Sequence, residues 1–225
     1  MKQYAILVVG RGKLAAELLG NLSGGAIARV LRWEDRAIAG DAPAMVAHAG
    51  SGRELPAALG FCAERRAPLF ELSTAGTPIP ADVSFPAVVC PNVNLQILRF
   101  MAMVKRFGPC FKDCRVQIAE SHQASKKTRP GTALYLARSL GLDESAIASE
   151  RDPRRQLAEI GIPPEHLDRH AWHRISISGD GVEIRLETRA LGPTSYAAGF
   201  AEIVSRTAAR PLPPGIHDAV DLFAQ

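Results

Sequence analysis

The first 32 residues constrain the fold more than any other part of the sequence. Residues 4–9 (YAILVV) form a continuous apolar run, which is typical of a strand buried on both faces of a parallel sheet. A glycine turn at residues 10–12 interrupts this run, and residues 13–22 then carry apolar side chains at helical spacing. Two glycines end that helix, and residues 26–32 indicate a second strand. A strand, a turn, a helix and a strand in this order predict a βαβ unit.

The same alternation of strands and helices continues to residue 90. The pattern predicts strands at residues 44–49, 68–72 and 83–90 and a helix at residues 54–66. Alternation of this kind predicts an α/β fold with a Rossmann-type, doubly wound parallel sheet. We expect residues 1–92, joined by a returning segment at 210–225, to form a dinucleotide-binding domain.

After Pro91 the pattern changes to that of a second, α+β domain. Helices are predicted at residues 95–107, 132–140 and 197–209, and strands at 115–120, 172–178 and 182–190, with a polar loop at 121–130. Gly179-Asp180-Gly181 between the last two strands is typical of a β-hairpin. We therefore expect residues 93–209 to carry a mixed or mostly antiparallel sheet and to serve in substrate binding and oligomerisation.

Composition excludes several classes of protein. The chain has 225 residues, of which 47% are hydrophobic and 22% charged, and this balance is that of a globular protein rather than a disordered one. The net charge of +4 comes without a Lys/Arg block or an aromatic stacking set, which argues against nucleic acid and fits a small anionic ligand. The apolar run at residues 4–9 is too short to cross a membrane, so no membrane role is expected.

The four cysteines indicate a reducing compartment. They are too few for a disulfide scaffold in a chain of this length, so we expect free thiols and a cytoplasmic protein. Cys110 and Cys114 lack a second pair of metal-ligating residues nearby, and no metal site is predicted.

The turn at residues 10–15 (GRGKLA) has the form G-x-G-x-x-A between a predicted strand and a predicted helix. Glycines allow a tight turn and close approach to a pyrophosphate, while the helix N-terminus supplies amide donors and positive potential. We expect Gly10, Arg11, Gly12, Lys13 and Leu14 to bind a dinucleotide, the alternative being a purely structural glycine turn.

The end of the second predicted strand leaves the choice of dinucleotide open. Glu34 could accept hydrogen bonds from the adenosine ribose, which would favour NADH, while Arg32 or Arg36 could hold the additional phosphate of NADPH. Because both residue types are present, the sequence predicts NADPH or NADH without deciding between them. A solvated charged loop is the alternative for each residue.

Residues 120–133 (ESHQASKKTRPGTA) carry the most specific pattern. His122 follows a predicted strand and could donate a proton near neutral pH. Lys126 could pair with a carboxylate, and the amides of Gly131 and Thr132, with the Thr132 hydroxyl, could receive another. Taken singly, these residues could be an exposed histidine, solvated lysines and an ordinary helix cap, so it is their clustering that suggests a site for an anionic substrate.

This segment resembles the dihydrodipicolinate reductase family, which carries E-x-H-H/Q-x-x-K-x-D-x-(P)-S-G-T-A at the corresponding place. The residues that match are Glu120, His122, Gln123, Lys126, Gly131, Thr132 and Ala133. The resemblance extends to Ser73-Thr74-Ala75-Gly76, to residues 91–94 and to residues 216–222, and so covers nearly the whole chain.

The resemblance implies an NAD(P)H-dependent oxidoreductase that reduces dihydrodipicolinate (4-hydroxy-tetrahydrodipicolinate) in lysine and diaminopimelate biosynthesis, as a homotetramer or dimer. It implies that His122 is the proton donor and that Lys126 orients the substrate, a small dicarboxylate. By position, Gln123, Gly131 and Thr132 would also bind the substrate. Ser73, Thr74, Ala75, Gly76 and Asn92 would contact the cofactor.

The sequence also departs from the family pattern. Pro130 runs directly into Gly131, so the family's serine is missing, and Thr128 stands in place of its aspartate. The segment after the third strand contains His48, which is expected near the nicotinamide. These departures leave two alternatives: a related oxidoreductase acting on another anionic imine or enamine, or a non-catalytic relative that binds a nucleotide or a dicarboxylate.

Overall fold

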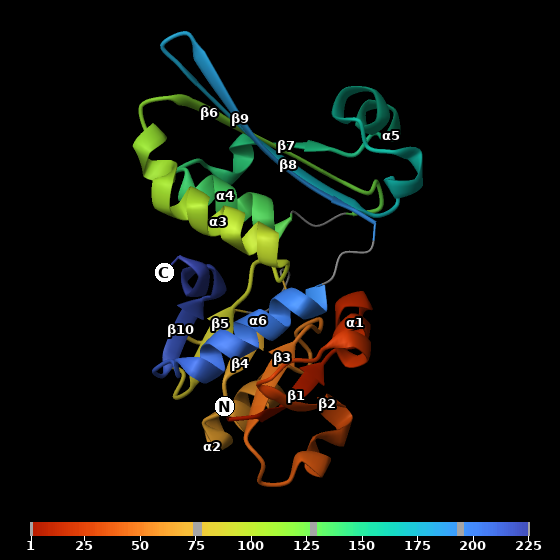
Figure 1. Ribbon diagram of the computed structural model, residues 1–225, viewed down its shortest axis with the longest axis vertical. Coiled ribbons are helices and arrows are strands. Elements are labelled where there is room, and N and C mark those ends of the chain that lie inside the picture. Colours follow the sequence, from red (N-terminus) through yellow and green to blue (C-terminus); the bar gives the residue numbers. More distant parts are fainter. Residues whose placement is uncertain (1, 74–77, 127–129, 193–195, 225) are drawn as a thin grey trace. The chain divides into compact units, whose positions relative to one another are not determined.

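The structure, a computed structural model, describes residues 2–73, 78–126, 130–192 and 196–224. The chain divides into two compact units (Figure 1). The first consists of Met1–Arg99 and Ser195–Gln225, and the second of Phe100–Thr194.

The first unit is built on a six-stranded sheet in which every strand pair is parallel. The order across the sheet is β10-β5-β4-β3-β1-β2. The strands are β1 (Tyr4–Val9), β2 (Ile27–Arg32), β3 (Ala44–His48), β4 (Leu69–Glu71), β5 (Pro86–Val89) and β10 (Gly215–Asp218). Residues 5–9 of β1 are buried, as expected for a strand covered on both faces.

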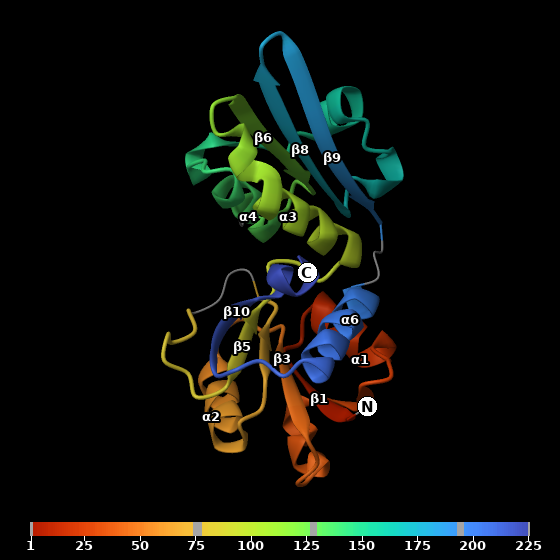
Figure 2. The ribbon, with the colours of Figure 1, turned by 60° about the vertical axis from the view of Figure 1, so that its left-hand side comes forward.

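Helices cover both faces of this sheet (Figure 2). On one face lie α1 (Lys13–Asn21) and α6 (Tyr196–Ala209), and Phe200 of α6 makes an edge-to-face contact with Phe70 of β4 at 5.2 Å. On the other face lie α2 (Leu55–Arg65) and the 3-10 helix η1 (Trp33–Ala39), joined by a contact between Trp33 and Phe61 at 5.6 Å. The predicted α/β fold with a doubly wound sheet is confirmed.

The crevice of this sheet lies between β1 and β3. The chain leaves β1 toward β2 on one side and later returns to β3 on the other, so the strand order reverses here. Val9 pairs with His48 at the carboxyl ends of the two strands, and the Ala49 amide donates to the Val9 carbonyl at 2.8 Å. In open α/β sheets, ligands bind at such a reversal point.

The chain returns to the first unit at about residue 195, earlier than residue 210, the position expected from the sequence. Helix α6 belongs to it, and β10 adds a sixth strand beside β5, followed by the 3-10 helix η6 (Ala219–Phe223). Gly199 of α6 explains the close packing, because a Cβ at this position would overlap the Val93 carbonyl oxygen. Only four residues long, β10 carries no periodic pattern that could predict it.

The second unit contains a four-stranded sheet in the order β7-β6-β8-β9. The strands are β6 (Arg115–His122), β7 (Ile147–Glu150), β8 (His170–Gly179) and β9 (Val182–Leu191). Only the β6–β7 pair is parallel, so the sheet is mixed, as predicted. The hairpin turn places Asp180 at φ 52° and Gly181 at φ 78°, the left-handed region that such turns require.

Helices and short turns flank this second sheet. Helix α4 (Gly131–Ser139) packs against β6, and Lys105 of α3 (Leu95–Phe107) lies over the Tyr135 ring of α4. The short elements are η2 (Gly108–Phe111), η3 (Glu144–Ala146), α5 (Pro153–Arg155), the π-helical turn η4 (Gln156–Ile160) and η5 (Pro164–His166). Ile160 and Ile162 pack against Trp172 of β8, which holds the η4 segment to the sheet.

Two features of this unit differ from the sequence analysis. Strand β6 continues through Ser121 and His122, which were assigned to the polar loop, because these residues pair with Trp172 and Ala171 of β8. Strand β7 was not predicted. None of the helices within the described ranges is long and apolar enough to cross a membrane.

Candidate active site

His122 is the last residue of β6, and Glu120 precedes it by two positions. Because side chains alternate along a strand, both project from the same face of the sheet. The Nδ1 atom of His122 lies 2.7 Å from Oε2 of Glu120, which fixes the orientation of the ring.

Glu120 is completely buried and carries a second partner, Arg151. The guanidinium donates to both carboxylate oxygens, over 2.6 Å to Oε1 and 3.1 Å to Oε2. Burial by itself would raise the pKa of Glu120, but hydrogen bonds from His122, Arg151 and Ser149 outweigh it and lower the pKa to about 2. Glu120 is therefore an ionised carboxylate, and the ionised form accepts the proton on His122 Nδ1.

Arg151 reaches Glu120 because of the register of the parallel pair β6–β7. Glu120 lies opposite Ser149 of β7, and Arg151 comes two residues after Ser149, directly after the end of that strand. Nothing in the sequence placed the Arg151 segment beside β6, so no role was predicted for this residue.

His173 lies beneath His122 on the neighbouring strand β8, opposite Glu120. The two imidazole rings meet edge to face at 5.6 Å, and His173 Nδ1 lies 3.2 Å from the Thr188 hydroxyl. Burial, with the nearby His122, lowers the pKa of His173 to about 3. His173 thus lines the site as an uncharged imidazole at physiological pH.

Gln156 holds the ends of β6 and β7 together from the π-helical turn. Its side chain is buried, and its amide nitrogen donates to the backbone carbonyl oxygens of His122 at 2.8 Å and Glu150 at 3.2 Å. Such turns often occur at functional sites. Gln156 was not singled out from the sequence.

Lys126 lies near His122 in the turn after β6, where its amide donates to the Gln123 carbonyl at 3.0 Å. Burial and the charge of Arg151 lower the pKa of Lys126, with Glu120 acting in the opposite direction. Burial also lowers the pKa of His122, and although Glu120 raises it, the charges of Lys126 and Arg151 lower it further. The site is therefore positively charged around a histidine that prefers to be neutral.

Helix α4 begins at Gly131, after Pro130 in an extended conformation, and Thr132 is buried in its first turn. Amides in the first turn of a helix point away from the helix body and are suited to an anion. The predicted anion-binding residues thus stand at the start of a helix that packs against β6. Lys127, Thr128 and Arg129 lie outside the described residues.

The predicted dinucleotide residues gather in the first unit, around the carboxyl end of β1. Gly10 adopts φ +120°, and a Cβ there would come within 2.6 Å of the Ala49 carbonyl oxygen. Gly12 precedes α1, and a Cβ there would meet nothing within 4 Å, so the space before the helix is open. Lys13 and Leu14 form the first turn of α1. This arrangement fits the pyrophosphate of a dinucleotide.

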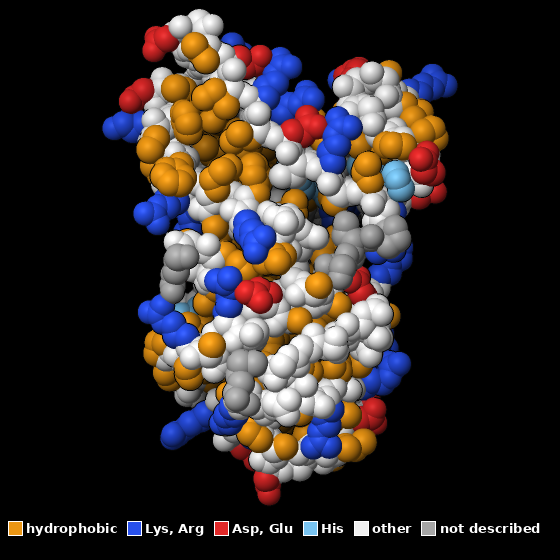
Figure 3. All heavy atoms as spheres, in the orientation of Figure 1, with side chains coloured by type: hydrophobic (Ala, Val, Ile, Leu, Met, Phe, Trp, Pro, Cys, Tyr) orange, Lys and Arg blue, Asp and Glu red, His pale blue; other side chains and the backbone are white. Residues whose placement is uncertain are grey.

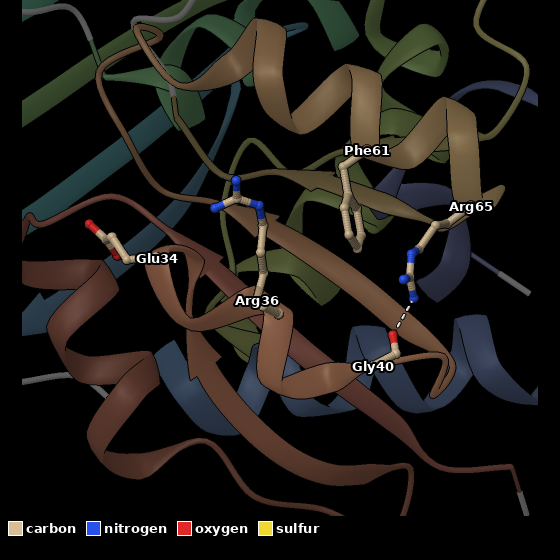
Figure 4. Close-up of a pocket in the computed structure, with 6 residues that line it drawn as sticks. Glu34, Arg36, Gly40, Phe61 and Arg65 are labelled. Atoms are coloured by element: carbon tan, nitrogen blue, oxygen red, sulfur yellow. Dashed lines mark hydrogen bonds between the residues drawn. The ribbon is translucent and has the colours of Figure 1, made fainter.

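The charged segment after β2 lines a cavity of about 250 Å³, shown in Figure 4. Arg36 stacks over the Trp33 ring at 4.6 Å, while Glu34 lies 3.0 Å from Arg11 in an exposed ion pair. Arg32 is exposed at the end of β2. Phe61 and Arg65 of α2 line the same cavity, and they were not predicted from the sequence.

A second carboxylate–histidine pair lies at the ends of β3 and β4. His48 is fully buried, and its Nδ1 atom lies 2.8 Å from Glu71 Oε2, while Oε1 of Glu71 accepts the Ser73 amide at 2.8 Å. Thr74, Ala75 and Gly76 lie outside the described residues. Asn92 accepts the amide of Asn94 through Oδ1 at 2.7 Å, which forms a turn before α3.

Comparison with known proteins gives a family match over residues 96–222, to the model described as dihydrodipicolinate reductase, C-terminus. The match covers more than half of the chain and includes the whole His122 cluster. The chain belongs to the dihydrodipicolinate reductase family. The resemblance read from residues 120–133 is therefore confirmed.

Curated relatives that bear the name of this reductase match slightly more than half of the chain. A chloroplastic protein of Oryza sativa subsp. japonica, named probable 4-hydroxy-tetrahydrodipicolinate reductase 1, is 31% identical over 134 residues. The match covers 54% of this chain and 38% of that protein. For 4-hydroxy-tetrahydrodipicolinate reductase 1 of Arabidopsis thaliana, the identity is 31% over 129 residues, covering 52% and 37%. The chain thus spans less than half the length of these relatives.

Solved structures support the fold of the whole chain. The dipicolinate-bound dihydrodipicolinate reductase from Paenisporosarcina sp. TG-14 superposes with a TM-score of 0.64 at 15% identity, covering 96% of this chain and 97% of that one. An oxidoreductase from Agrobacterium radiobacter in complex with NAD+, L-tartaric acid and magnesium gives a TM-score of 0.55 at 12% identity, covering 99% and 94%.

Proposed function

We propose that this protein is an NAD(P)H-dependent reductase that converts 4-hydroxy-tetrahydrodipicolinate to tetrahydrodipicolinate, a step of lysine and diaminopimelate biosynthesis. The observation that carries the proposal is the His122 cluster. A histidine held by an ionised carboxylate stands beside a lysine, within the segment that matches the reductase family.

In this proposal each residue of the cluster has one task. His122 donates a proton to the substrate, oriented by the hydrogen bond from its Nδ1 atom to Glu120. Lys126 pairs with one substrate carboxylate, and Gly131 and Thr132 receive the other at the start of α4, with Gln123 alongside. The resulting positive field favours a dianion.

The first unit would hold the nicotinamide cofactor, which when bound supplies the hydride. The supporting observations are the Gly10–Gly12 turn, the open space before α1 and the crevice between β1 and β3. The structural similarity to an oxidoreductase with NAD+ bound agrees with this assignment. Arg32 and Arg36 would bind the additional phosphate of NADPH, and Glu34 the ribose of NADH. If so, Arg32→Ala and Arg36→Ala weaken NADPH binding more than NADH binding, whereas equal effects on both would remove the assignment.

The decisive experiment follows reduced-cofactor absorbance after mixing the purified protein with NADPH or NADH and enzymatically generated dihydrodipicolinate. We expect turnover in the wild type and its loss in His122→Ala, with the cofactor dissociation constant unchanged. Cofactor binding without turnover in the wild type would contradict the proposal.

A second candidate function follows from the altered substrate loop. Because Pro130 precedes Gly131 directly, the loop lacks the family's serine hydroxyl. A related oxidoreductase for another anionic imine or enamine would consume reduced cofactor only with that substrate. A non-catalytic relative would bind dipicolinate or the cofactor and turn over neither.

We also propose a homo-oligomer and a cytoplasmic location. Apolar side chains stay exposed on the second unit, among them Val182, Ile184, Met103 and Phe107. Val182 and Ile184 belong to β9, and Met103 and Phe107 belong to α3. On the face in view, Figure 3 shows hydrophobic side chains gathered at the upper left, where Figure 1 places the second unit. A second copy of the chain would cover such a surface. The four cysteines are free, which suits a reducing compartment.

A further inference from the structure

The charge on His122 depends on Arg151, although the two side chains are not bonded to each other. Both bind the same carboxylate: Glu120 accepts His122 through Oε2 at 2.7 Å and Arg151 through both oxygens at 2.6 and 3.1 Å. Glu120 is completely buried, so its interactions with His122 and Arg151 are screened by water far less than those of a surface ion pair. The negative charge that would otherwise stabilise a protonated His122 is shared with a permanent cation.

This arrangement selects one form of the ring in the ligand-free protein. Ionised Glu120 accepts the Nδ1 proton, so the uncharged ring carries a lone pair on Nε2. A proton donor needs the opposite, a proton on Nε2 as well. The geometry that orients His122 therefore leaves it without the proton that it must donate.

We propose that Arg151 keeps His122 uncharged in the ligand-free protein by occupying Glu120, and that a bound dicarboxylate reverses this, so that binding takes up one proton onto His122 Nε2. The inference rests on the proposed function and deepens it, because it makes the acid appear only when an anionic substrate is present. Arg151 is then a positioning residue that acts through Glu120.

The other groups that face His122 agree with this description. His173 of β8 remains neutral, with a pKa of about 3 that is set by burial and by His122 itself. Thr188 of β9 lies against His173, and Gln156 of the π-helical turn carries no charge. Lys126 is the cation on the ligand side. A dianion beside Lys126 would cancel the field that disfavours the imidazolium, whose pKa would rise as a result.

The test uses the full-length chain and dipicolinate, a dianionic probe that cannot turn over. Calorimetric titration in two buffers of different ionisation enthalpy measures the protons taken up on binding. At a pH between the free and bound pKa values of His122, we expect close to one proton to be taken up per site. In this range the dipicolinate dissociation constant should increase up to tenfold for each unit by which the pH rises. His122→Gln should bind dipicolinate without either effect.

Three variants distinguish the specific effect of Arg151 on His122 from the effect of removing a positive charge elsewhere. In Arg151→Gln, Glu120 acts on His122 alone, so the His122 titration followed by NMR of labelled histidine should move to higher pH and proton uptake at neutral pH should fall. Arg151→Lys should restore part of the wild-type behaviour. Arg155→Gln removes an equal charge from an exposed arginine that pairs with Glu150 and Glu159, and should leave the His122 titration in place.

The outcomes distinguish this inference from the proposed function. A wild-type His122 that is already charged at neutral pH, or dipicolinate binding without proton uptake, would overturn the inference even if the enzyme turns over. Proton uptake with no turnover would keep the inference and reject the reductase. If Arg151→Gln fails to fold, the wild-type and His122→Gln titrations still test two consequences of the inference, an uncharged His122 in the free protein and proton uptake on binding. The failure of either one overturns the inference.

Discussion

At the scale of single residues, the charge state of each ionisable side chain in the site is set by its burial and its neighbours. Glu120, His122 and His173 are ionisable, yet only His122 is poised to change charge during a reaction. Glu120 is held ionised by hydrogen bonds from three residues, and burial holds His173 neutral. In the proposed reaction, one histidine thus serves as the proton donor, while the histidine on the neighbouring strand stays neutral beside it.

Glu120→Gln tests the carboxylate directly. Glutamine has nearly the same shape, but it leaves the charge of Arg151 unpaired and cannot stabilise the imidazolium. We expect kcat to fall by about 10²–10⁴, the range of general acid catalysis, with little change in cofactor affinity. Steady-state kinetics and a cofactor titration measure the two effects, and a variant that retains wild-type kcat would remove Glu120 from the mechanism.

Buried His173 predicts a loss of stability in acid. Its pKa is about 3 in the folded protein and about 6.5 in the unfolded chain. The unfolded state therefore binds more protons in this range, and His173 should cost about 2 kcal/mol of stability between pH 6.5 and pH 5. Urea unfolding at pH 7 and pH 5 measures the loss, and His173→Asn should reduce it. An equal loss in both proteins would contradict this account.

At the scale of elements, short turns and strand ends position the site residues. The π-helical turn places Gln156 against the carbonyl of His122, and the register of β6 with β7 brings Arg151 to Glu120. In the first unit, Glu71 at the end of β4 holds the Ser73 amide. The contacts of Gln156 and Arg151 join segments that lie far apart in the sequence, whereas that of Glu71 is local.

Gly199→Ala should destabilise the first unit. A Cβ on this α6 residue would overlap the Val93 carbonyl oxygen and lie 2.9 Å from the Leu95 amide nitrogen, so backbone must shift. We expect a loss of about 3 kcal/mol in the free energy of unfolding. Gly60→Ala is the matched control, since that helical glycine has nothing within 4 Å of a Cβ and the change should stabilise by about 0.5–1 kcal/mol. Equal effects of the two substitutions would contradict the packing of α6.

Glu71→Gln should weaken cofactor binding through the segment that begins at Ser73. The substitution disrupts a buried pair in which one carboxylate accepts both the Ser73 amide and His48. A hydrogen bond to a charged group contributes about 1.5–3 kcal/mol, so we expect roughly a tenfold weaker NADPH dissociation constant by fluorescence titration. Dipicolinate affinity should not change. Glu64→Gln, on the exposed side of α2, is the control, and an equal effect there would remove the role of Glu71.

At the scale of the whole molecule, the chain consists of two units with different chemistry. The first unit offers a parallel sheet with a glycine turn at its crevice, and the second a mixed sheet with ionisable groups at one end. The second unit also exposes the apolar side chains around the β8–β9 hairpin.

The proposed oligomer predicts a mass of two or four times the 24.1 kDa of one chain in light scattering after gel filtration. Ile184→Glu, on exposed β9, should shift the protein toward the single-chain mass. Ile38→Glu introduces the same charge on an exposed isoleucine of the first unit and should leave the mass unchanged. A wild type that elutes as one chain would contradict the proposal.

The sequence by itself determined the parts of this protein that depend on local patterns. The apolar run at residues 4–9 became β1, the residues 95–107 became α3, and the string from Glu120 to Ala133 identified the family. Periodicity and turn residues are local, so one sequence suffices to detect them.

Only the tertiary structure decided which distant residues meet. Strand register brings His173 to His122 and Arg151 to Glu120, and a π-helical turn brings Gln156 to the His122 carbonyl. Neither the register nor the turn is encoded by spacing along the chain. The short strand β10 was likewise placed by its pairing with β5. The charge state of His122 belongs to the same class, because a pKa is set by burial and by neighbouring charges that the fold brings together.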